Sequence, residues 1–194
     1  MSRFPAIPLA TLVGVLCAPT AAPCAPSPVE ALSGTAAPSS SSVAWLPPAI
    51  TALGPTIDSA ARTHGVDARL VAIVIYVESR GRARAVSPAG ALGLMQMMPK
   101  TAAAVARAHG LPAPTRKALL DPAVNIDLGT RHLAALISDF GDPALDDATV
   151  QRVATAYNGG AAVLLEPRAP SRETRRYAAR VLQLWGAKDA SVRP

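Results

Sequence analysis

The chain has 194 residues, which gives room for one folded domain of ordinary size and makes several domains unexpected. Half of the residues are apolar and only 4% are aromatic, with Ala and Leu supplying most of the apolar ones. This composition suits closely packed helices better than a sheet, so we expect a mainly helical fold. The excess of 19 Lys and Arg over 13 Asp and Glu favours a polyanionic partner. It does not choose among wall polymers, membrane surfaces and nucleic acid, and a solvated basic face also explains it.

Residues 1–26 have the layout of a secretory signal, because a basic Arg3 precedes an apolar stretch over residues 7–18 and then small residues. The apolar stretch is too short to span a bilayer. Cys17 and Cys24 both fall in this segment, and neither follows the small residue that normally precedes a lipidated cysteine. We therefore expect export to the periplasm without a stable membrane anchor.

The composition also predicts how the rest of the chain is divided. Residues 27–48 are rich in Pro, Ser and Ala, which is typical of a flexible or partly extended linker, and Trp45 is expected to dock the end of this linker onto the domain. The domain itself is expected over residues 49–188, followed by a short tail over residues 189–194.

Caps and apolar periodicity predict the helices of this domain. Gly65 is expected to end the first helix in a left-handed cap, and Asp67, Asp121, Asp147 and Ser171 are expected as helix caps. An irregular loop is expected over residues 81–93, and no strand is predicted. The expected helices cover residues 55–64, 68–79, 99–109, 122–140, 147–157 and a last segment after residue 171.

Glu78 is an acidic residue on an apolar helix face. Val71, Val74 and Ile75 lie seven, four and three residues before it, at helical spacing. Burial and the negative end of the helix dipole both disfavour a charged carboxylate there, so the pKa of Glu78 should be raised. A carboxylic acid that keeps its proton near neutral pH is what glycosidic cleavage needs.

The local pattern also allows a purely structural role for Glu78. Arg80, Arg82 and Arg84 follow it closely, and any of them is a possible ion-pair partner. From periodicity alone, this structural ion pair is the more common arrangement.

Three ordered motifs resemble those of the soluble lytic transglycosylases. Glu78-Ser79 is followed by SPAGALGLMQMMPKTA over residues 87–102 and by Ala-Tyr-Asn over residues 156–158. Two further stretches, DPAVNIDLGTRHL over residues 121–133 and ETRRYAARV over residues 173–181, are also similar to that family. The resemblance covers roughly residues 55–184, and its glutamate is the one that the burial argument selects independently.

The resemblance implies a lysozyme-like helical fold with a sugar-binding groove, and Glu78 as general acid and then base, without a metal or cofactor. It also implies that Ser87, Gln96 and Met98 line the groove and that Tyr157 holds the catalytic carboxyl by a hydrogen bond. Met95 and Met97 are expected to fill the core. The full set of expected substrate-binding residues is Ser87, Gln96, Met98, Tyr157, Asn158 and Tyr177.

Several of these positions also have ordinary structural explanations. Tyr157 and Asn158 fit a core aromatic followed by a helix-ending residue, and Tyr177 fits a core position. His132 stands where the family often has an aromatic residue, which is expected to affect packing. The three histidines show no metal-ligand spacing.

No second acid stands out across from Glu78, although glycosidases usually need one. The resemblance implies instead that the acetamide of the substrate stabilises the developing cation and that its 6-hydroxyl attacks, giving 1,6-anhydro-N-acetylmuramic acid. We expect peptidoglycan rather than nucleic acid as the partner, and a monomer. Two alternatives remain: a goose-type lysozyme-like hydrolase, and a weakly active wall-binding subunit of a secretion or conjugation apparatus.

Overall fold

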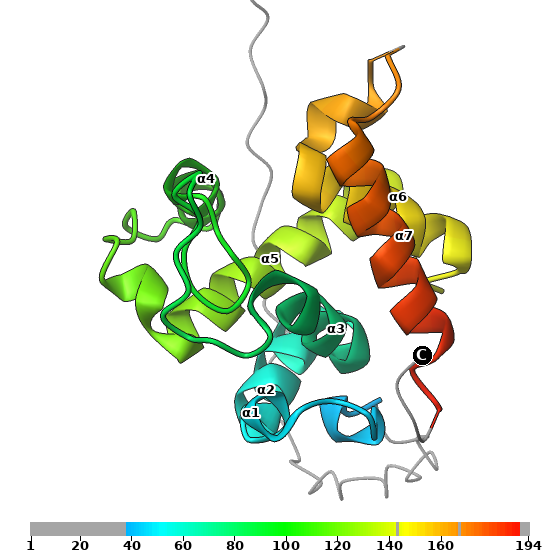
Figure 1. The fold of residues 1–194 in the computed structure, drawn as a ribbon. Helices are drawn as coiled ribbons and strands as arrows, with labels where there is room; N and C mark the ends of the chain where they lie inside the picture. Colours follow the sequence, from blue (N-terminus) through cyan, green and yellow to red (C-terminus); the bar gives the residue numbers. More distant parts are fainter. Residues whose placement is uncertain (1–37, 143, 167, 191–194) are drawn as a thin grey trace, which may run out of the picture. The chain divides into compact units, whose positions relative to one another are not determined.

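The computed structural model describes residues 38–142, 144–166 and 168–190; the expected signal over residues 1–26 lies outside them, as do residues 27–37 of the expected linker. The α-helices of the described part are α1 (Pro48–Thr51), α2 (Gly54–His64), α3 (Ala68–Ser79), α4 (Pro99–Ala108), α5 (Pro122–Phe140), α6 (Asp147–Gly159) and α7 (Arg172–Gly186) (Figure 1). Short 3-10 turns occupy Ser40–Ser42, Ala118–Leu120 and Ala161–Leu164. The described residues contain isolated β-bridges but no strand, which confirms the mainly helical prediction. None of these helices combines the length and the apolar character that a membrane crossing requires.

The helix ends follow the cap residues of the sequence closely. Gly65 adopts a φ of 66° after α2, and the side chain of Asp121 accepts hydrogen bonds from two N–H groups of the first turn of α5. Ser171 accepts from the N–H of Thr174 at 3.0 Å and so begins α7. The start of α6 differs from the expectation, because its cap is Asp146 and not Asp147.

Helix α3 lies at the centre of the domain. Residues 70–76 are all buried, so this helix has no solvent-exposed face along most of its length. It packs between α2 and α7, while α5 contacts α2, α4 and α6, and α6 and α7 lie side by side (Figure 1). The central position of α3 fixes where its last turn, and therefore Glu78, lies.

Residues 39–48, expected to be the end of a flexible linker, are instead part of the packed domain. Val43 is fully buried and Leu46 is 6% exposed. The hydroxyl of Ser39 and the N–H of Ser40 both donate to the carboxylate of Asp58, at 2.7 and 2.8 Å. These contacts join the segment to α2 and bring its apolar residues into the core.

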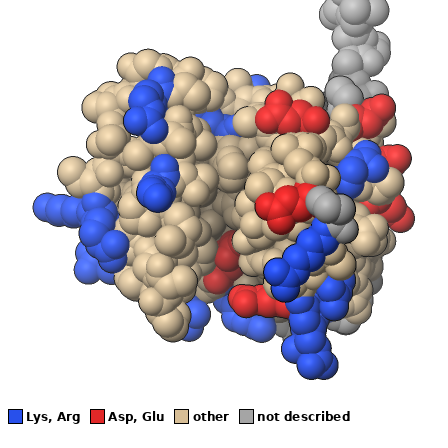
Figure 2. Space-filling view, turned by 90° about the horizontal axis from the view of Figure 1, so that it is seen from above, with Lys and Arg blue, Asp and Glu red and all other residues tan. Residues whose placement is uncertain are grey.

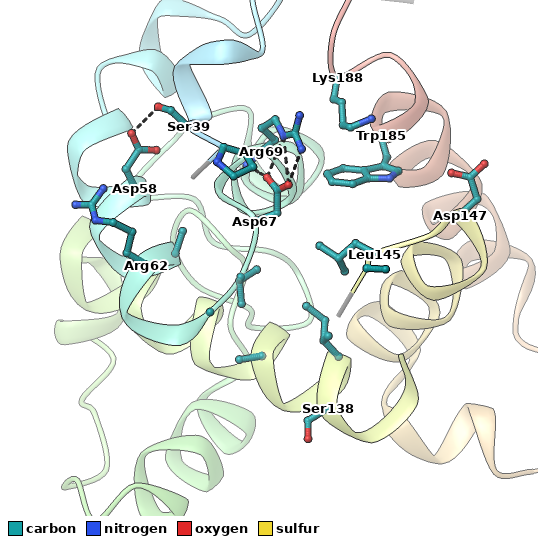
Figure 3. Close-up of a pocket in the computed structure, with 17 residues that line it drawn as sticks. Ser39, Asp58, Arg62, Asp67, Arg69, Ser138, Leu145, Asp147, Trp185 and Lys188 are labelled. Carbon is teal, nitrogen blue, oxygen red and sulfur yellow. Dashed lines mark hydrogen bonds and ion pairs between the residues drawn. The ribbon is translucent and has the colours of Figure 1, made fainter. Parts of the chain in front are cut away.

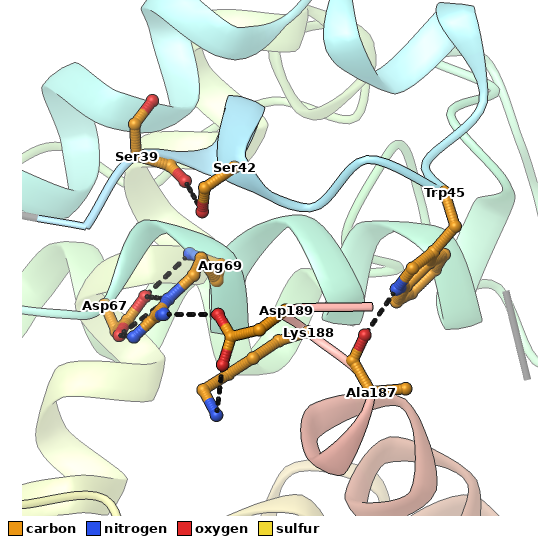
Figure 4. Close-up of polar contacts among 8 residues, drawn as sticks. All are labelled: Ser39, Ser42, Trp45, Asp67, Arg69, Ala187, Lys188 and Asp189. Carbon is orange, nitrogen blue, oxygen red and sulfur yellow. Dashed lines mark hydrogen bonds and ion pairs between the residues drawn. The ribbon is translucent and has the colours of Figure 1, made fainter. Parts of the chain in front are cut away.

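Trp45 docks this segment onto the domain, as the sequence suggested. Its indole N–H donates to the carbonyl of Ala187 at 2.8 Å, next to the end of α7 (Figure 4). The indole also meets the ring of Tyr76 edge-on, with 5.6 Å between the ring centroids. The segment before α1 is therefore tied to the end of α7 beside α3.

A cluster of charged residues holds the same region. Arg69 forms ion pairs with Asp67 at 2.7 Å and with Asp189 at 3.2 Å (Figure 4). Its guanidinium also lies 5.5 Å from the ring centroid of Trp185. The start of the expected C-terminal tail is thus fastened to the domain through Asp189.

Candidate active site

The irregular loop between α3 and α4 carries most of the motif residues, and it begins with a tight turn. Arg80 has a φ of 55° and Gly81 a φ of 82°, so the chain reverses at once after α3. The hydroxyl of Ser79 accepts from the N–H of Gly81 at 3.2 Å and donates to a carbonyl of α3 at 3.3 Å. Ser79, the second residue of the first motif, therefore closes the helix and leaves Glu78 beside the loop.

A buried side chain on α5, Asn125, anchors the second motif. Its amide oxygen accepts from the N–H of Met95 at 2.8 Å, and its amide nitrogen donates to the carbonyls of Leu92 and Leu119 at 2.9 and 2.8 Å. Gly93 lies against this amide so closely that a Cβ there would stand 2.4 Å from the Asn125 nitrogen. This role of Asn125 was not predicted; an Asn within the apolar pattern of a long helix was the available signal.

A second close approach presses the loop onto α5. A Cβ at Gly129 would lie 2.4 Å from the sulfur of Met95, so this glycine leaves room for the methionine. Met95 is fully buried and Met97 is 2% exposed, which confirms that both fill the core. The loop is therefore packed tightly against α5 at Met95, which fixes the position of the following residue, Gln96.

Glu78 is mostly buried at the end of α3. Burial raises the pKa of its carboxyl from 4.5 to about 7, and the Tyr177 hydroxyl offsets part of this rise. That hydroxyl lies beside Glu78 without reaching regular hydrogen-bond geometry with any described residue. At neutral pH the Glu78 carboxyl is therefore protonated in a large fraction of molecules.

Glu78 has no ion-pair partner among the described residues. The guanidinium of Arg80 turns to Tyr76 instead, where it lies 5.3 Å from the ring centroid and donates to the hydroxyl at 3.1 Å. Arg82 donates from Nε to the carbonyl of Ser79 at 3.1 Å. The structural ion pair that the local sequence allowed is thus not formed, so no neighbouring cation opposes the rise in the pKa of Glu78 that burial causes.

A cavity of about 590 Å³ opens at the Glu78 carboxyl, and its lining includes Arg82, Arg84, Ser87 and Gln96. The hydroxyl of Ser87 accepts from the N–H of Ala91 at 3.0 Å, which leaves its own proton free to donate. Gln96 has a φ of 47°, and its amide nitrogen donates to the carbonyls of Gly93 and Ala85 at 2.9 and 3.3 Å. Its amide oxygen remains an acceptor, so the cavity offers neutral polar groups and two cations around one acid.

The two tyrosines near Glu78 differ from the expected arrangement. Tyr157 donates its hydrogen bond to the carbonyl of Met95 at 2.9 Å, whereas the hydroxyl beside Glu78 belongs to Tyr177. The reason is tertiary: α6 places Tyr157 against the second motif, and α7 crosses α3 near Glu78. Burial, and then the charge of Glu78, raises the pKa of both hydroxyls well above the usual range, so both stay protonated.

The remaining expected site residues lie outside this cavity. Met98 is 41% exposed at the start of α4, and Asn158 is exposed in the last turn of α6; neither lines the cavity at Glu78. The ring of His132 lies 5.3 Å from that of Tyr157, and burial lowers the pKa of the imidazole. His132 thus takes the packing place of an aromatic residue. No group of three His, Cys, Asp or Glu suited to a metal occurs in the described part of the chain.

A larger cavity, about 1000 Å³, lies at the other end of α3 and contains none of the expected site residues (Figure 3). Asp67 in its wall is paired with Arg69. Burial raises the pKa of Asp58, but hydrogen bonds from Ser39 and Ser40 outweigh this and lower it. Asp67 is held in an ion pair and the pKa of Asp58 is lowered, whereas the pKa of Glu78 is raised, so the smaller cavity at Glu78 is the better candidate for an acid-catalysed reaction.

Comparison with known proteins gives a consistent result. The profile of the Transglycosylase SLT domain matches residues 55–178. Membrane-bound lytic murein transglycosylase C from Shigella sonnei (strain Ss046) is 43% identical over 113 residues, which are 56% of this chain and 31% of that protein. The chain therefore spans only about a third of the length of this relative.

Two solved structures resemble the fold. An inactive mutant of lytic transglycosylase Slt from Pseudomonas aeruginosa superposes with a TM-score of 0.57 at 27% identity, covering 72% of this chain and 25% of that one. The 70 kDa soluble lytic transglycosylase from Escherichia coli gives 0.60 at 24% identity, covering 70% of this chain and 23% of that one. This likeness confirms the lysozyme-like helical fold. With the profile match over most of its length and the motifs around Glu78, the chain belongs to the Transglycosylase SLT domain family.

Proposed function

We propose that this chain is a peptidoglycan lytic transglycosylase, with Glu78 as its single acid/base catalyst. It cleaves the β-1,4 bond between N-acetylmuramic acid and N-acetylglucosamine and forms 1,6-anhydro-N-acetylmuramic acid. One observation carries the proposal: among the described residues, the only acid in the cavity lining is a mostly buried carboxyl that has no ion-pair partner and a pKa of about 7. Such a group can both give and take a proton near neutral pH.

The reaction needs both functions of Glu78 in turn. The carboxyl first protonates the bridging oxygen while the bond from this oxygen to C1 of the muramic acid breaks. The acetamide of the same sugar stabilises the cation that develops at C1. The carboxylate then takes the proton of the 6-hydroxyl as that oxygen bonds to C1, which returns Glu78 to its protonated form. No water enters the products.

The neighbouring residues fit supporting roles in this scheme. Ser87 and Gln96 offer a donor and an acceptor to sugar hydroxyls and acetamides, since both line the cavity with Glu78. Tyr177 steadies the charged form of the carboxyl, because its hydroxyl lowers the pKa of Glu78. Met98, Tyr157 and Asn158 complete the proposed substrate-binding set, with Tyr157 acting indirectly through the backbone of the second motif.

A hydrolase of the goose-type lysozyme class is the main rival. Such an enzyme activates water with a second carboxylate. The lining of the cavity at Glu78 includes no other Asp or Glu among the described residues, which favours attack by the sugar itself. A weakly active wall-binding subunit is less favoured, because the acid and the polar groups of the second motif are all in place.

The proposed setting of the enzyme is the periplasm. The signal-like residues 1–26 support export, and the Shigella relative is named as a membrane-bound murein enzyme. We propose that the exported protein acts on peptidoglycan as a monomer. A contribution to a secretion or conjugation apparatus is compatible with this activity, and deletion followed by a transport assay would test it.

Mass spectrometry of the released muropeptides tests the reaction. Digestion of purified peptidoglycan should give products lighter than those of hydrolysis by one water, and Glu78→Gln should give none. Hydrated reducing ends would establish the lysozyme-type reaction instead. Wild-type turnover by Glu78→Gln would remove this residue from the mechanism.

A further inference from the structure

The charge of the chain is distributed unevenly along the sequence. Residues 79–120 contain seven Lys and Arg and no Asp or Glu, so the rest of the chain has 12 cations against 13 carboxylates. The whole net positive charge therefore belongs to the loop after α3, to α4 and to the segment before α5. In Figure 2, one half of the visible face carries Lys and Arg without carboxylates, and a hollow separates it from the half where the carboxylates gather.

Two of these seven cations lie at the candidate active site. Arg82 and Arg84 line the same cavity as Glu78. The Nε of Arg82 donates a hydrogen bond to the carbonyl of Ser79 at 3.1 Å, which fixes one edge of the guanidinium. Its two terminal nitrogens form no hydrogen bond with any described residue. Arg84 forms neither a hydrogen bond nor an ion pair within the described part. Both side chains are exposed, so an incoming ligand can reach them.

The other charges nearby do not satisfy these two guanidinium groups. Arg80 belongs to the same turn, but its guanidinium lies over the ring of Tyr76 and donates a hydrogen bond to its hydroxyl. It does not line the cavity. Glu78 is the only acid that the described residues contribute to the cavity, and burial keeps much of it in the neutral form at pH 7. The cavity thus presents two neighbouring cations to a substrate without a carboxylate of the protein to balance them.

The chemistry of the proposed substrate says what these cations meet. The sugar rings of peptidoglycan are uncharged, and the lactyl carboxyl of a substituted muramic acid is used in the amide bond to its peptide. The free carboxylates of a substituted strand therefore belong to the stem peptide. A guanidinium binds a carboxylate through two parallel hydrogen bonds, which makes arginine well suited to this recognition.

We propose that Arg82 and Arg84 bind stem-peptide carboxylates next to the sugar held at Glu78, so that the enzyme prefers strands whose peptides carry free carboxylates. This proposal rests on the proposed function, and it names a specificity that the cleavage reaction itself does not require. The two arginines are specificity-determining residues in this scheme; the proton transfers remain with Glu78.

The test compares one substrate in two charge states. Uncross-linked peptidoglycan strands are used as prepared, and after carbodiimide coupling with ammonia has turned their carboxylates into amides. The rate of anhydro-product release gives kcat/KM for each. Wild-type kcat/KM should fall about tenfold on amidated strands, mainly through a higher KM, as expected for two partly exposed charge-assisted contacts. The double variant Arg82→Gln/Arg84→Gln should lose about the same factor on native strands and should no longer distinguish the two substrates.

Arg107→Gln is the matched control, because Arg107 is an exposed cation of α4 that does not line the cavity. It removes one charge from the same cationic region and should follow the wild type within about twofold on both substrates. Equal wild-type rates on native and amidated strands would overturn the proposal, and so would a loss in Arg107→Gln as large as that of the double variant. If the wild type released anhydro products from neither substrate, the proposed function itself would fail and this specificity with it.

Discussion

Replacing Glu78 by Gln should stabilise the protein at high pH while abolishing activity. The pKa of Glu78 is raised from 4.5 to about 7 on folding, so the folded state binds more protons than the unfolded chain between these values. Stability should therefore fall as pH rises through this window, and the loss should be complete above pH 7. Since one pKa unit corresponds to about 1.4 kcal/mol, ionising Glu78 in the fold costs up to about 3 kcal/mol.

The variant removes this cost only where the carboxyl would be ionised. Gln has nearly the shape of a protonated glutamate, so at pH 4.5 the two proteins should have similar free energies of unfolding. At pH 8 the variant should be more stable by up to about 3 kcal/mol, an upper value because the Glu78 side chain borders an open cavity.

Urea denaturation followed by circular dichroism, for both proteins at pH 4.5 and pH 8, measures this difference. A gain in stability that is the same at both pH values would refute the reasoning from the pKa. A loss at pH 8 would mean that Glu78 is half of a structural ion pair, because the variant would then leave a partly buried arginine without its partner.

Three other variants, one of them with a matched control, test the surroundings of Glu78. Tyr177→Phe removes the hydroxyl that lowers the pKa of Glu78. The limb of the pH–rate profile where activity falls with rising pH should therefore move to higher pH. An unchanged limb would mean that Tyr177 does not influence the pKa of Glu78. Asn125→Ala leaves three backbone groups of the second motif without their hydrogen bonds and should cost about 2–4 kcal/mol of unfolding free energy, measured by urea denaturation. Gly93→Ala should lower the free energy of unfolding by more than about 2 kcal/mol, because the new Cβ would clash with the Asn125 amide. Gly90→Ala is the control: a Cβ there meets open space and only the positive φ is unfavourable, so the cost should be about 1 kcal/mol. Equal melting temperatures for the two variants would contradict the close contact at Gly93.

Much of the fold could be read from the sequence, because the signals of a helix are local. Asp121 followed by Pro122, and Ser171 before the last helix, set helix starts through hydrogen bonds within three residues of the cap. Glu78 was identified in the same way, since its apolar neighbours lie on the same helix and the motif order agrees. Its raised pKa required only that this helix face be buried, and the packing of α3 between α2 and α7 provides that.

Only the tertiary structure decided which groups meet across the chain. The hydrogen bond of Tyr157 goes to a carbonyl 62 residues away, and the hydroxyl beside Glu78 comes from Tyr177 on another helix. Three arginines that look equivalent in sequence divide between a contact with Tyr76 and an open cavity. Side chains choose partners by the distances that packing creates, and no local pattern contains those distances. The sequence determined the catalytic candidate, and the packing of the helices determined what surrounds it.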